Sequence, residues 1–204
     1  MKLLLTGFEP FGGSAVNPSE QVVRVLAQER LRRVQLRTAI LPVDRVNSPA
    51  ALIRAMQKYR PDVVLCLGEA SGRMAISIER VAINLMDYRI ADNAGNQAQD
   101  EPIVPDGPAA YFVTLPVRAM LEAVRAANVP AELSLSAGAF LCNQVLYTLL
   151  HHLALNNPGV GAGFAHVPPL PEQVVNKDRL IASMGLDIML TGIRAAISAV
   201  ANES

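Results

Sequence analysis

The sequence predicts a single α/β domain, an α/β/α sandwich in which helices cover both faces of a largely parallel, mixed central sheet. Short aliphatic runs that end at glycine alternate along the chain with amphipathic stretches, which is the pattern of this fold class. The chain has 204 residues, 51% of them hydrophobic, and is long enough for a substantial core. Because no Gly/Ser-rich or charge-dense linker interrupts the pattern, residues 1–204 are interpreted as one domain.

Five segments have the composition of strands. Residues 2–6 and 62–67 are aliphatic runs that stop at glycine, as expected of parallel strands covered on both faces. Residues 73–85 and 131–136 alternate between apolar and polar positions, and residues 161–167 form a further short apolar run. These runs are separated by helical patterns, so the expected connections are crossovers between strands of one sheet.

Five stretches have the apolar spacing of amphipathic helices. One begins at Ser48, a capping hydroxyl, with Pro49 at the first helical position, and Pro61 closes it. The other four are residues 19–30, 114–128, 141–156 and 183–201. Residues 88–108 are polar, rich in Asp, Asn, Gly and Pro, and lack a period, which is typical of a functional loop.

Charge and hydropathy exclude several classes of partner. The 18 basic and 18 acidic residues balance, and the densest basic cluster, at residues 30–33, is explained by a solvated helix end, so no nucleic acid is expected. The longest apolar stretch, residues 145–155, is broken by His151 and His152 and is shorter than the roughly 20 residues that cross a bilayer. The N-terminal apolar run is too short for a signal peptide. A cytoplasmic protein without a membrane span is expected.

Neither a metal nor an organic cofactor is expected. The phosphate-binding loop and the nucleophile elbow of α/β hydrolases are both missing from the sequence, and its clustered glycines lack the spacing of a dinucleotide site. Three histidines and two cysteines, without a Cys-x-x-Cys pair, do not make a zinc pattern. Two cysteines are also too few for a disulfide framework, which indicates reduced thiols.

Cys142 is the candidate nucleophile. It lies where a predicted strand turns into a helix, and the backbone N–H groups of a first helical turn would lower the pKa of its thiol and could hold an oxyanion. A small buried side chain is the alternative role, and position alone leaves both open. Cys66, inside an apolar run, is interpreted as structural.

A thiol nucleophile requires a base and a group that orients it. His166 ends a later predicted strand, where α/β folds present reactive groups. Glu79 is a carboxylate on an otherwise apolar strand, which is costly to bury without a partner. Arg80, its neighbour, could be a partner only from the opposite strand face. The alternative for His166 is a core histidine.

Four segments together resemble the pyrrolidone carboxyl peptidases, also called pyroglutamyl peptidases of type I. The resemblance runs in order from about Lys2 to the final helix. The segments are Thr6-Gly-Phe-Glu-Pro-Phe-Gly-Gly with Asn17-Pro-Ser, Glu79-Arg-Val-Ala-Ile-Asn with Arg89-Ile-Ala-Asp-Asn-Ala-Gly, Ser136-Ala-Gly-Ala-Phe-Leu-Cys-Asn, and Phe164-Ala-His-Val-Pro.

The resemblance implies a catalytic domain that removes N-terminal pyroglutamate from peptides without a cofactor and assembles as a homotetramer. It implies Cys142 as nucleophile, His166 as general acid and base, Glu79 as the orienting carboxylate and Arg89 near the oxyanion. The implied pocket has Phe8 and Phe11 as walls around the lactam ring, with Phe140 either a further wall or a core residue. Its remaining lining would be Asn17, Val43, Ile90, Leu141 and Val145, with Asn17 expected to fix the loop that carries Phe11.

Two positions depart from the family pattern. Glu69 stands where the family commonly has Gln, and Ser71 where it commonly has Gly. A carboxylate in the pocket at position 69 could change affinity or pH dependence. Two other functions therefore stay open, which are a cysteine amidase or acyl-transfer enzyme for another small lactam or amide, and a silent binding protein that retains the fold.

Overall fold

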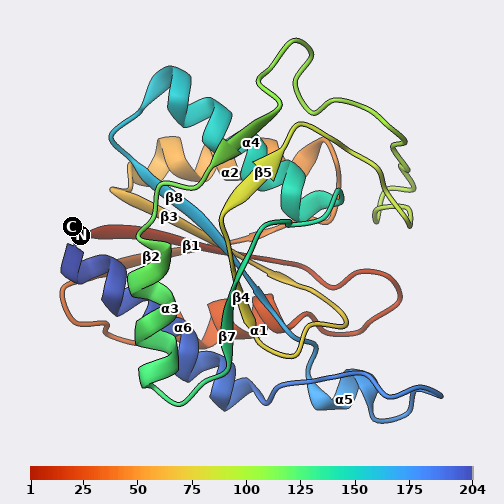
Figure 1. Cartoon of the computed structure of the whole chain (residues 1–204). Helices are drawn as coiled ribbons and strands as arrows, with labels where there is room; N and C mark the ends of the chain where they lie inside the picture. The colour runs from red at the N-terminus through yellow and green to blue at the C-terminus, as the bar shows by residue number, and fades with distance from the viewer. Residues whose placement is uncertain (204) are drawn as a thin grey trace.

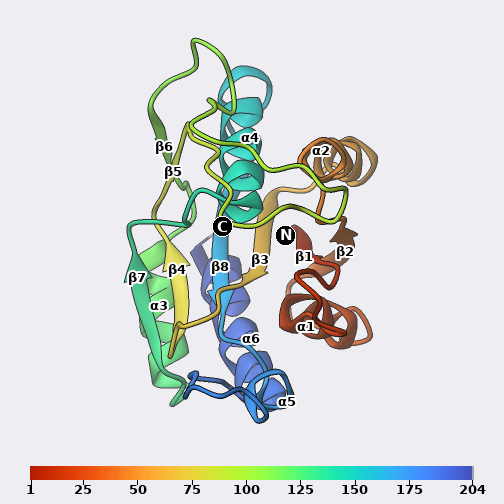
Figure 2. The same cartoon turned by 90° about the vertical axis from the view of Figure 1, so that its right-hand side faces the viewer.

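The protein is described here by a computed structural model that covers residues 1–203. Its centre is a six-stranded sheet in the order β2-β1-β3-β8-β4-β7, and a two-stranded sheet, β5-β6, lies beside it (Figures 1 and 2). The strands are β1 (Lys2–Phe8), β2 (Gln35–Leu41), β3 (Val63–Glu69), β4 (Ile76–Glu79), β5 (Val81–Ile83), β6 (Ala110–Phe112), β7 (Ala131–Ser134) and β8 (Gly161–Val167).

Helices cover both faces of the large sheet, as predicted for an α/β/α sandwich. The helices α1, α3 and α6 pack on one face, and α2 and α4 on the other, where the β5-β6 pair also contacts α4 (Figures 1 and 2). Their bounds are α1 (Pro18–Leu26), α2 (Asn47–Tyr59), α3 (Val117–Ala126), α4 (Leu141–Asn156) and α6 (Leu186–Glu203), with a short α5 (Pro171–Val174).

The sheet is mixed because β4 runs antiparallel to β8. Strands β2, β1, β3 and β8 are mutually parallel, and β7 is parallel to β4. The expectation of a largely parallel, mixed sheet is confirmed. Because β4 runs in the opposite direction, Ser77 lies opposite His166. The end of β8 is therefore next to the middle of β4.

One strand prediction was wrong, and two strands, β2 and β6, were not predicted. Residues 73–85 do not form one long strand, since β4 ends at Glu79 and β5, which belongs to the small sheet, begins at Val81. Alternation of side chains continues through such a break, so the pattern cannot reveal it. Strand β2 was not predicted, because its side chains are mostly half-buried or exposed at the sheet edge and its apolar pattern is weak.

Every predicted helix is present, but the residue predicted to cap one of them does not do so. Helix α4 has its predicted bounds, and the others begin or end within a few residues of prediction. Ser48 does not cap α2, because the helix begins at Asn47 and the buried Ser48 hydroxyl has no hydrogen-bond partner. The Asp44 carboxylate instead accepts hydrogen bonds from the N–H groups of Val46 and Asn47.

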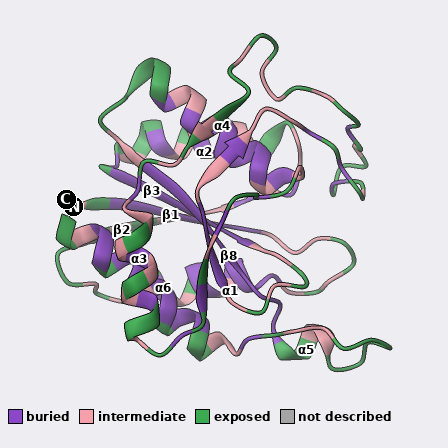
Figure 3. Ribbon diagram, viewed as in Figure 1, coloured by how far each residue is buried: buried purple, intermediate pink, exposed green. Residues whose placement is uncertain are grey.

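Two apolar clusters fill the space between the sheet and its helices, and the central strands are almost wholly buried (Figure 3). The side chains of β3 point alternately into the two clusters, so every second residue of this strand faces α4. Residues 88–108 contain no helix or strand, as predicted, apart from Glu101 paired with Met86 in a single bridge. No helix within residues 1–203 has both the length and the apolar character that a membrane crossing needs.

Candidate active site

Strands β4 and β8 bring Glu79 and His166 into direct contact. The Nδ1 atom of His166 lies 2.7 Å from Glu79 Oε1, and the two side chains are 4% and 0% exposed. The neighbours of both residues along the two antiparallel strands, Ile78 and Ala165, lie in the cluster on the opposite face, so both side chains point toward the face that carries α4. Such a contact directs the free Nε2 atom of the ring away from Glu79, as a catalytic histidine requires.

Helix α4 places Cys142 above the neighbouring strand β3. A Cβ atom built on Gly68 would lie 2.7 Å from Cys142 Sγ and 2.8 Å from Phe164 Cζ, so the thiol rests against the bare backbone of this glycine. Gly68 is aligned with His166 on the adjacent strand. The three predicted catalytic side chains therefore meet at one point of the sheet.

Helix α4 is fixed at its first turn by Asn143, a residue the sequence reasoning missed. Its amide oxygen accepts a hydrogen bond of 2.9 Å from the N–H of Ile83, and its amide nitrogen donates to the carbonyls of Ile83 and Leu85. The β5 backbone is thus joined directly to the residue after Cys142. The only sign of this role in the sequence was an asparagine at the predicted start of a helix, directly after the candidate nucleophile.

The expected low pKa of the Cys142 thiol was wrong in direction. Burial raises this pKa to about 12, and electrostatic interactions with Glu79, Cys66 and Glu69 add to the rise. The backbone hydrogen bonding at the helix start lowers it, but by less. The thiol therefore keeps its proton at neutral pH until a base removes it, and the buried Cys66 behaves in the same way, with a pKa of about 12.

His166, whose backbone is aligned with Gly68, is the base predicted for Cys142. No hydrogen bond joins the two side chains within residues 1–203. Catalytic contacts are often loose before substrate binds. A carboxylate on the opposite ring nitrogen, as Glu79 is here, would stabilise an imidazolium.

Arg73 is a second group on the Glu79 carboxylate. Its Nη2 atom lies 3.2 Å from Glu79 Oε1 and donates a 2.8 Å hydrogen bond to the carbonyl of Ser136. The cation beside Glu79 is therefore Arg73 and not its sequence neighbour Arg80. The requirement for a cation beside a buried carboxylate was the signal, but the turn that returns Arg73 to β4 could not be read from the sequence.

A cavity of about 510 Å³ opens beside this site. It lies between the loop at residues 11–16, the end of β3 and the segment around α5. Of the predicted binding residues it is lined by Phe11, Glu69, Arg89 and Ile90. Arg89 is exposed and makes no ion pair within the described residues, so its guanidinium is available to a ligand in this cavity.

The aromatic residues near the cavity divide into a wall and a core. The Phe11 and Phe140 rings lie 6.1 Å apart, and Phe140 packs edge-on against Tyr88 at 4.7 Å. Phe8 is only 3% exposed and belongs to the apolar cluster beneath α2 and α4. Phe11 is therefore more open than Phe8, and it is the predicted ring wall that lines the cavity.

The other predicted lining residues are buried. Val43, Leu141 and Val145 are at most 2% exposed and lie in the same cluster as Phe8. Asn17 is the N-cap of α1, accepting from Ser19 N–H, and its amide nitrogen donates to the carbonyl of Glu9 at 3.0 Å. This matches the expected role of Asn17 in fixing the loop that carries Phe11.

Glu69 lies at the junction of the cavity and the catalytic groups. Burial raises the pKa of its carboxyl, and a hydrogen bond of 3.1 Å from Gln173 lowers it by less. Gln173 also donates to the Ser14 hydroxyl and to the carbonyl of Val16. Glu69 is thereby linked through Gln173 to the loop at residues 11–16. Its charge also acts on the pKa of Cys142.

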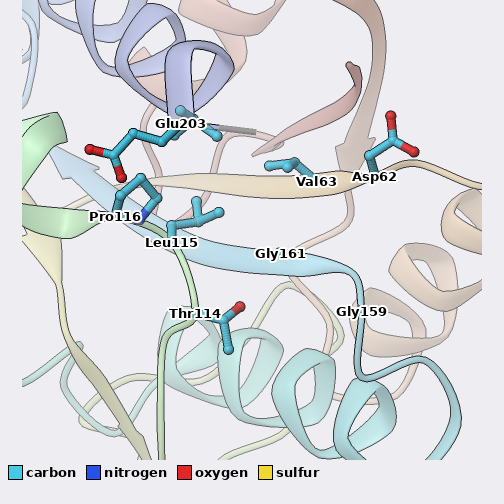
Figure 4. Close-up of a pocket in the computed structure, with 9 residues that line it drawn as sticks. Asp62, Val63, Thr114, Leu115, Pro116, Gly159, Gly161 and Glu203 are labelled. Carbon is cyan, nitrogen blue, oxygen red and sulfur yellow. The ribbon is translucent and has the colours of Figure 1, made fainter.

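A second cavity, of about 410 Å³, lies at the opposite end of the sheet (Figure 4). It is bordered by Val63 and Gly161, the first residues of β3 and β8, and by Asp62 and Glu203. It contains none of the predicted site residues and no thiol or imidazole. Within residues 1–203 no group of three or more His, Cys, Asp or Glu side chains could hold a metal ion.

A thiol, an imidazole and a buried carboxylate gathered on one face of an α/β/α sandwich define a cysteine hydrolase. The chain belongs to the pyroglutamyl peptidase family, whose family model matches residues 1–203.

Relatives and solved structures agree with this assignment. The pyrrolidone-carboxylate peptidase of Gloeobacter violaceus is 49% identical, covering 100% of this chain and 98% of its own, and that of Vibrio vulnificus strain CMCP6 is 47% identical, covering 94% and 89%. A mutant pyrrolidone carboxyl peptidase from Pyrococcus furiosus superposes with a TM-score of 0.96 at 40% identity, over 100% and 99% of the chains. Pyroglutamyl peptidase I from Bacillus amyloliquefaciens has a TM-score of 0.94 at 40% identity, over 98% and 97%.

Proposed function

We propose that this protein removes N-terminal pyroglutamate from peptides, with Cys142 as the nucleophile. The observation that carries the proposal is the His166–Glu79 pair at 2.7 Å beside a thiol seated on Gly68, in a chain of the pyroglutamyl peptidase family. The names of the relatives support the same substrate class.

The reaction begins when His166 accepts the proton of Cys142 and the resulting thiolate attacks the pyroglutamyl carbonyl carbon. The C=O bond becomes a C–O⁻ oxyanion, which the backbone N–H groups at the start of α4 stabilise, with Arg89 reaching from the cavity wall. The imidazolium then gives its proton to the leaving amine, and the C–N bond breaks to leave a thioester.

Hydrolysis of the thioester restores the enzyme. Neutral His166 takes a proton from water, the hydroxide attacks the thioester carbonyl, and the C–S bond breaks. The sulfur recovers the proton and free pyroglutamate leaves. Glu79 holds the ring in one tautomer throughout, since its Oε1 atom accepts from Nδ1.

Recognition of the lactam is assigned to the aromatic wall and the buried residues behind it. Pyroglutamate is small and uncharged, so an apolar pocket with few polar groups suits it. Phe11 lines the cavity with Phe140 packed next to it, and Phe8, Val43, Leu141 and Val145 belong to the buried apolar cluster that both rings contact. The peptide beyond the lactam is expected in the 510 Å³ cavity.

The test is release of a fluorescent amine from pyroglutamyl, prolyl and glutamyl amides by the purified, reduced protein. We expect turnover of the pyroglutamyl amide alone, with alkylation by iodoacetamide abolishing it. Cys142→Ser should lower kcat by at least about a thousandfold, because a hydroxyl is a far weaker nucleophile here, whereas Cys66→Ser should remain active. Near-normal rates in Cys142→Ser would refute the mechanism.

One observation favours a second candidate function. The Glu69 carboxyl faces the cavity that would receive the substrate, so the same catalytic groups could act on another small lactam or amide. Turnover of a different amide, with none of the pyroglutamyl compound, would favour this reading. A folded protein whose Cys142 reacts with iodoacetamide no faster than Cys66 would instead indicate a silent binding protein.

The resemblance to the family supports two further proposals. The protein is proposed to be a cytoplasmic homotetramer with reduced thiols. Light scattering should then give a mass about four times the 21.9 kDa of the chain. A mass that stays at that of one chain across the tested concentrations would exclude the tetramer.

A further inference from the structure

We propose that Arg73 is a positioning residue of the active site, which holds the Glu79 carboxylate in line with His166 and ties it to the loop before Cys142. The inference rests on the proposed function in one respect, because Glu79 matters only if His166 is the base. Arg73 itself does not touch the reacting atoms. It acts through two contacts, one to Glu79 and one to Ser136.

The Glu79 side chain has an unusual set of neighbours. It is fully buried, and its Oε1 atom receives both His166 Nδ1 at 2.7 Å and Arg73 Nη2 at 3.2 Å, while Oε2 is buried without a hydrogen-bond partner within the described residues. A buried carboxylate whose only neighbour is a neutral imidazole would be an uncompensated charge. Arg73 supplies the missing positive charge.

A tight turn delivers Arg73 to this place. The N–H of Arg73 donates to the carbonyl of Ala70 at 3.2 Å, and Gly72 has φ of +94°, a conformation that favours glycine. The N–H of Ala70 in turn donates to the carbonyl of Val167, the residue after His166. The arginine is therefore anchored to the strand that carries the base.

The second contact reaches the approach to the nucleophile. Arg73 Nη2 donates to the carbonyl of Ser136, and residues 136–140 lead from β7 into the first turn of α4, whose N–H groups would bind the oxyanion. One nitrogen atom of the guanidinium, Nη2, thus contacts both the orienting carboxylate and this loop.

Glu132 is the third neighbour of Arg73, and it contributes less to the position of the arginine side chain. Glu132 Oε1 lies 3.6 Å from Nη1, but this side chain is 52% exposed and already accepts a 2.7 Å hydrogen bond from Ser77. Exposed pairs of this kind contribute little to stability. The contacts with Glu79 and Ser136 therefore account for the position of Arg73.

The experiment compares Arg73→Met, Arg73→Lys and the matched control Arg80→Met. Arg80 is adjacent to Glu79 in sequence and has no ion pair within residues 1–203. We expect Arg73→Met to lower kcat about thirtyfold with KM changed less than about threefold, Arg73→Lys to recover about a third of the rate, and Arg80→Met to stay within about twofold of wild type.

A double-mutant cycle separates positioning from general structure. If Arg73 acts through Glu79, adding Arg73→Met to Glu79→Gln should lower kcat by less than about a further twofold. Thermal unfolding confirms that each variant is folded, and if Arg73→Met does not fold, the Arg73→Lys variant and its cycle with Glu79→Gln carry the test. Independent, multiplying losses, or a loss equal to that of Arg80→Met, would overturn the proposal.

Alkylation of Cys142 by iodoacetamide distinguishes this inference from the proposed function. The rate reports the His166-assisted thiolate without any substrate. We expect Arg73→Met to slow it about tenfold, and Glu79→Gln to slow it by a similar factor. A wild-type protein that alkylates quickly at Cys142 but cleaves no pyroglutamyl amide would refute the function and leave the role of Arg73 supported, whereas unchanged alkylation in Arg73→Met would refute that role.

Discussion

Cys66 and Cys142 share one apolar cluster and both have thiol pKa values raised by burial to about 12, yet their positions give them different chemistry. Cys66 is 0% exposed and lies within the body of β3. Cys142 is half-buried at a helix start, beside the strand that carries His166. Access and a neighbouring base, rather than acidity, support the proposal that Cys142 is the nucleophile.

The charge of Glu69 is predicted to reduce the reactivity of Cys142. Its carboxylate contributes to the raised thiol pKa, so Glu69→Gln should lower that pKa and increase the thiolate fraction at any pH below it. Alkylation of Cys142 should be about two- to threefold faster, and its pH profile should move to lower pH. Glu172→Gln, in the same cavity wall, should have no such effect. Equal rates in all three proteins would contradict the electrostatic role.

Phe11 is predicted to contribute mainly to binding. Its ring lines the cavity and faces Phe140, but it touches none of the catalytic groups. Phe11→Ala should raise KM about tenfold and change kcat less than about threefold, because contact with the lactam ring is lost equally in ground and transition states. Phe112→Ala, which removes a ring that is 70% exposed on β6, is the control. A loss confined to kcat would count against Phe11 as a ring wall.

At the level of helices and strands, α4 can approach β3 closely because residue 68 is a glycine without a side chain. A methyl group at residue 68 would lie within 3 Å of Cys142 Sγ and of the Phe164 ring. Gly68→Ala should therefore displace the nucleophile and lower kcat about a hundredfold, while costing about 1–3 kcal/mol of stability. Gly159→Ala, where nothing lies within 4 Å of the added atom, should be nearly normal. Full activity in Gly68→Ala would show that the thiol can work elsewhere.

The start of α1 organises the loop that carries Phe11. Asn17 caps the helix through its oxygen and holds the Glu9 carbonyl through its nitrogen, while the Ser19 hydroxyl accepts from the N–H of Phe8. Asn17→Ala should lower the free energy of unfolding by about 2 kcal/mol, since a cap and a buried hydrogen bond are lost together. Asn17→Asp retains the cap acceptor and should lose less. Urea unfolding measures both, and equal losses would argue against capping.

Across the whole molecule, α6 is joined to the segment after α1 by an ion pair. Arg194 contacts Glu29 at 2.6 and 2.8 Å, and this hydrogen bonding holds the pKa of Glu29 below its usual value. A lowered carboxyl pKa stabilises the fold above the unfolded-state pKa, and the benefit is lost as pH falls through the folded value. Because both side chains are partly exposed, Arg194→Ala should cost less than about 1 kcal/mol at pH 7.

The pH dependence of that difference is the sharper measurement. Denaturant unfolding of Arg194→Ala and wild type should converge as the pH falls through the lowered folded-state pKa of Glu29, below which its carboxyl is protonated in both proteins. Arg30→Ala, an exposed arginine near Glu29 without an ion pair in the described chain, is the control. A difference that persists at pH 3 would indicate lost packing of the arginine stem instead.

Local sequence patterns were sufficient to predict most of the helices and strands. Helix α4 and strand β8 were predicted with their final bounds, since each has a strong apolar period and clear ends. Strand β2 and the break after Glu79 were not, because an edge strand has few buried positions and a change of sheet leaves alternation intact. The catalytic residues remain predictions from chemistry and resemblance, and the geometry around Cys142 and His166 supports them.

Periodicity and motif residues are local properties of the chain, and they were sufficient to predict the fold class, the family and the candidate nucleophile, base and carboxylate. The environments of these residues became visible only in the folded chain. Burial against β3 reversed the expected shift of the Cys142 pKa, and the turn before β4 brought Arg73 to Glu79. Burial and charge pairing arise between segments far apart in sequence, so no local pattern contains them.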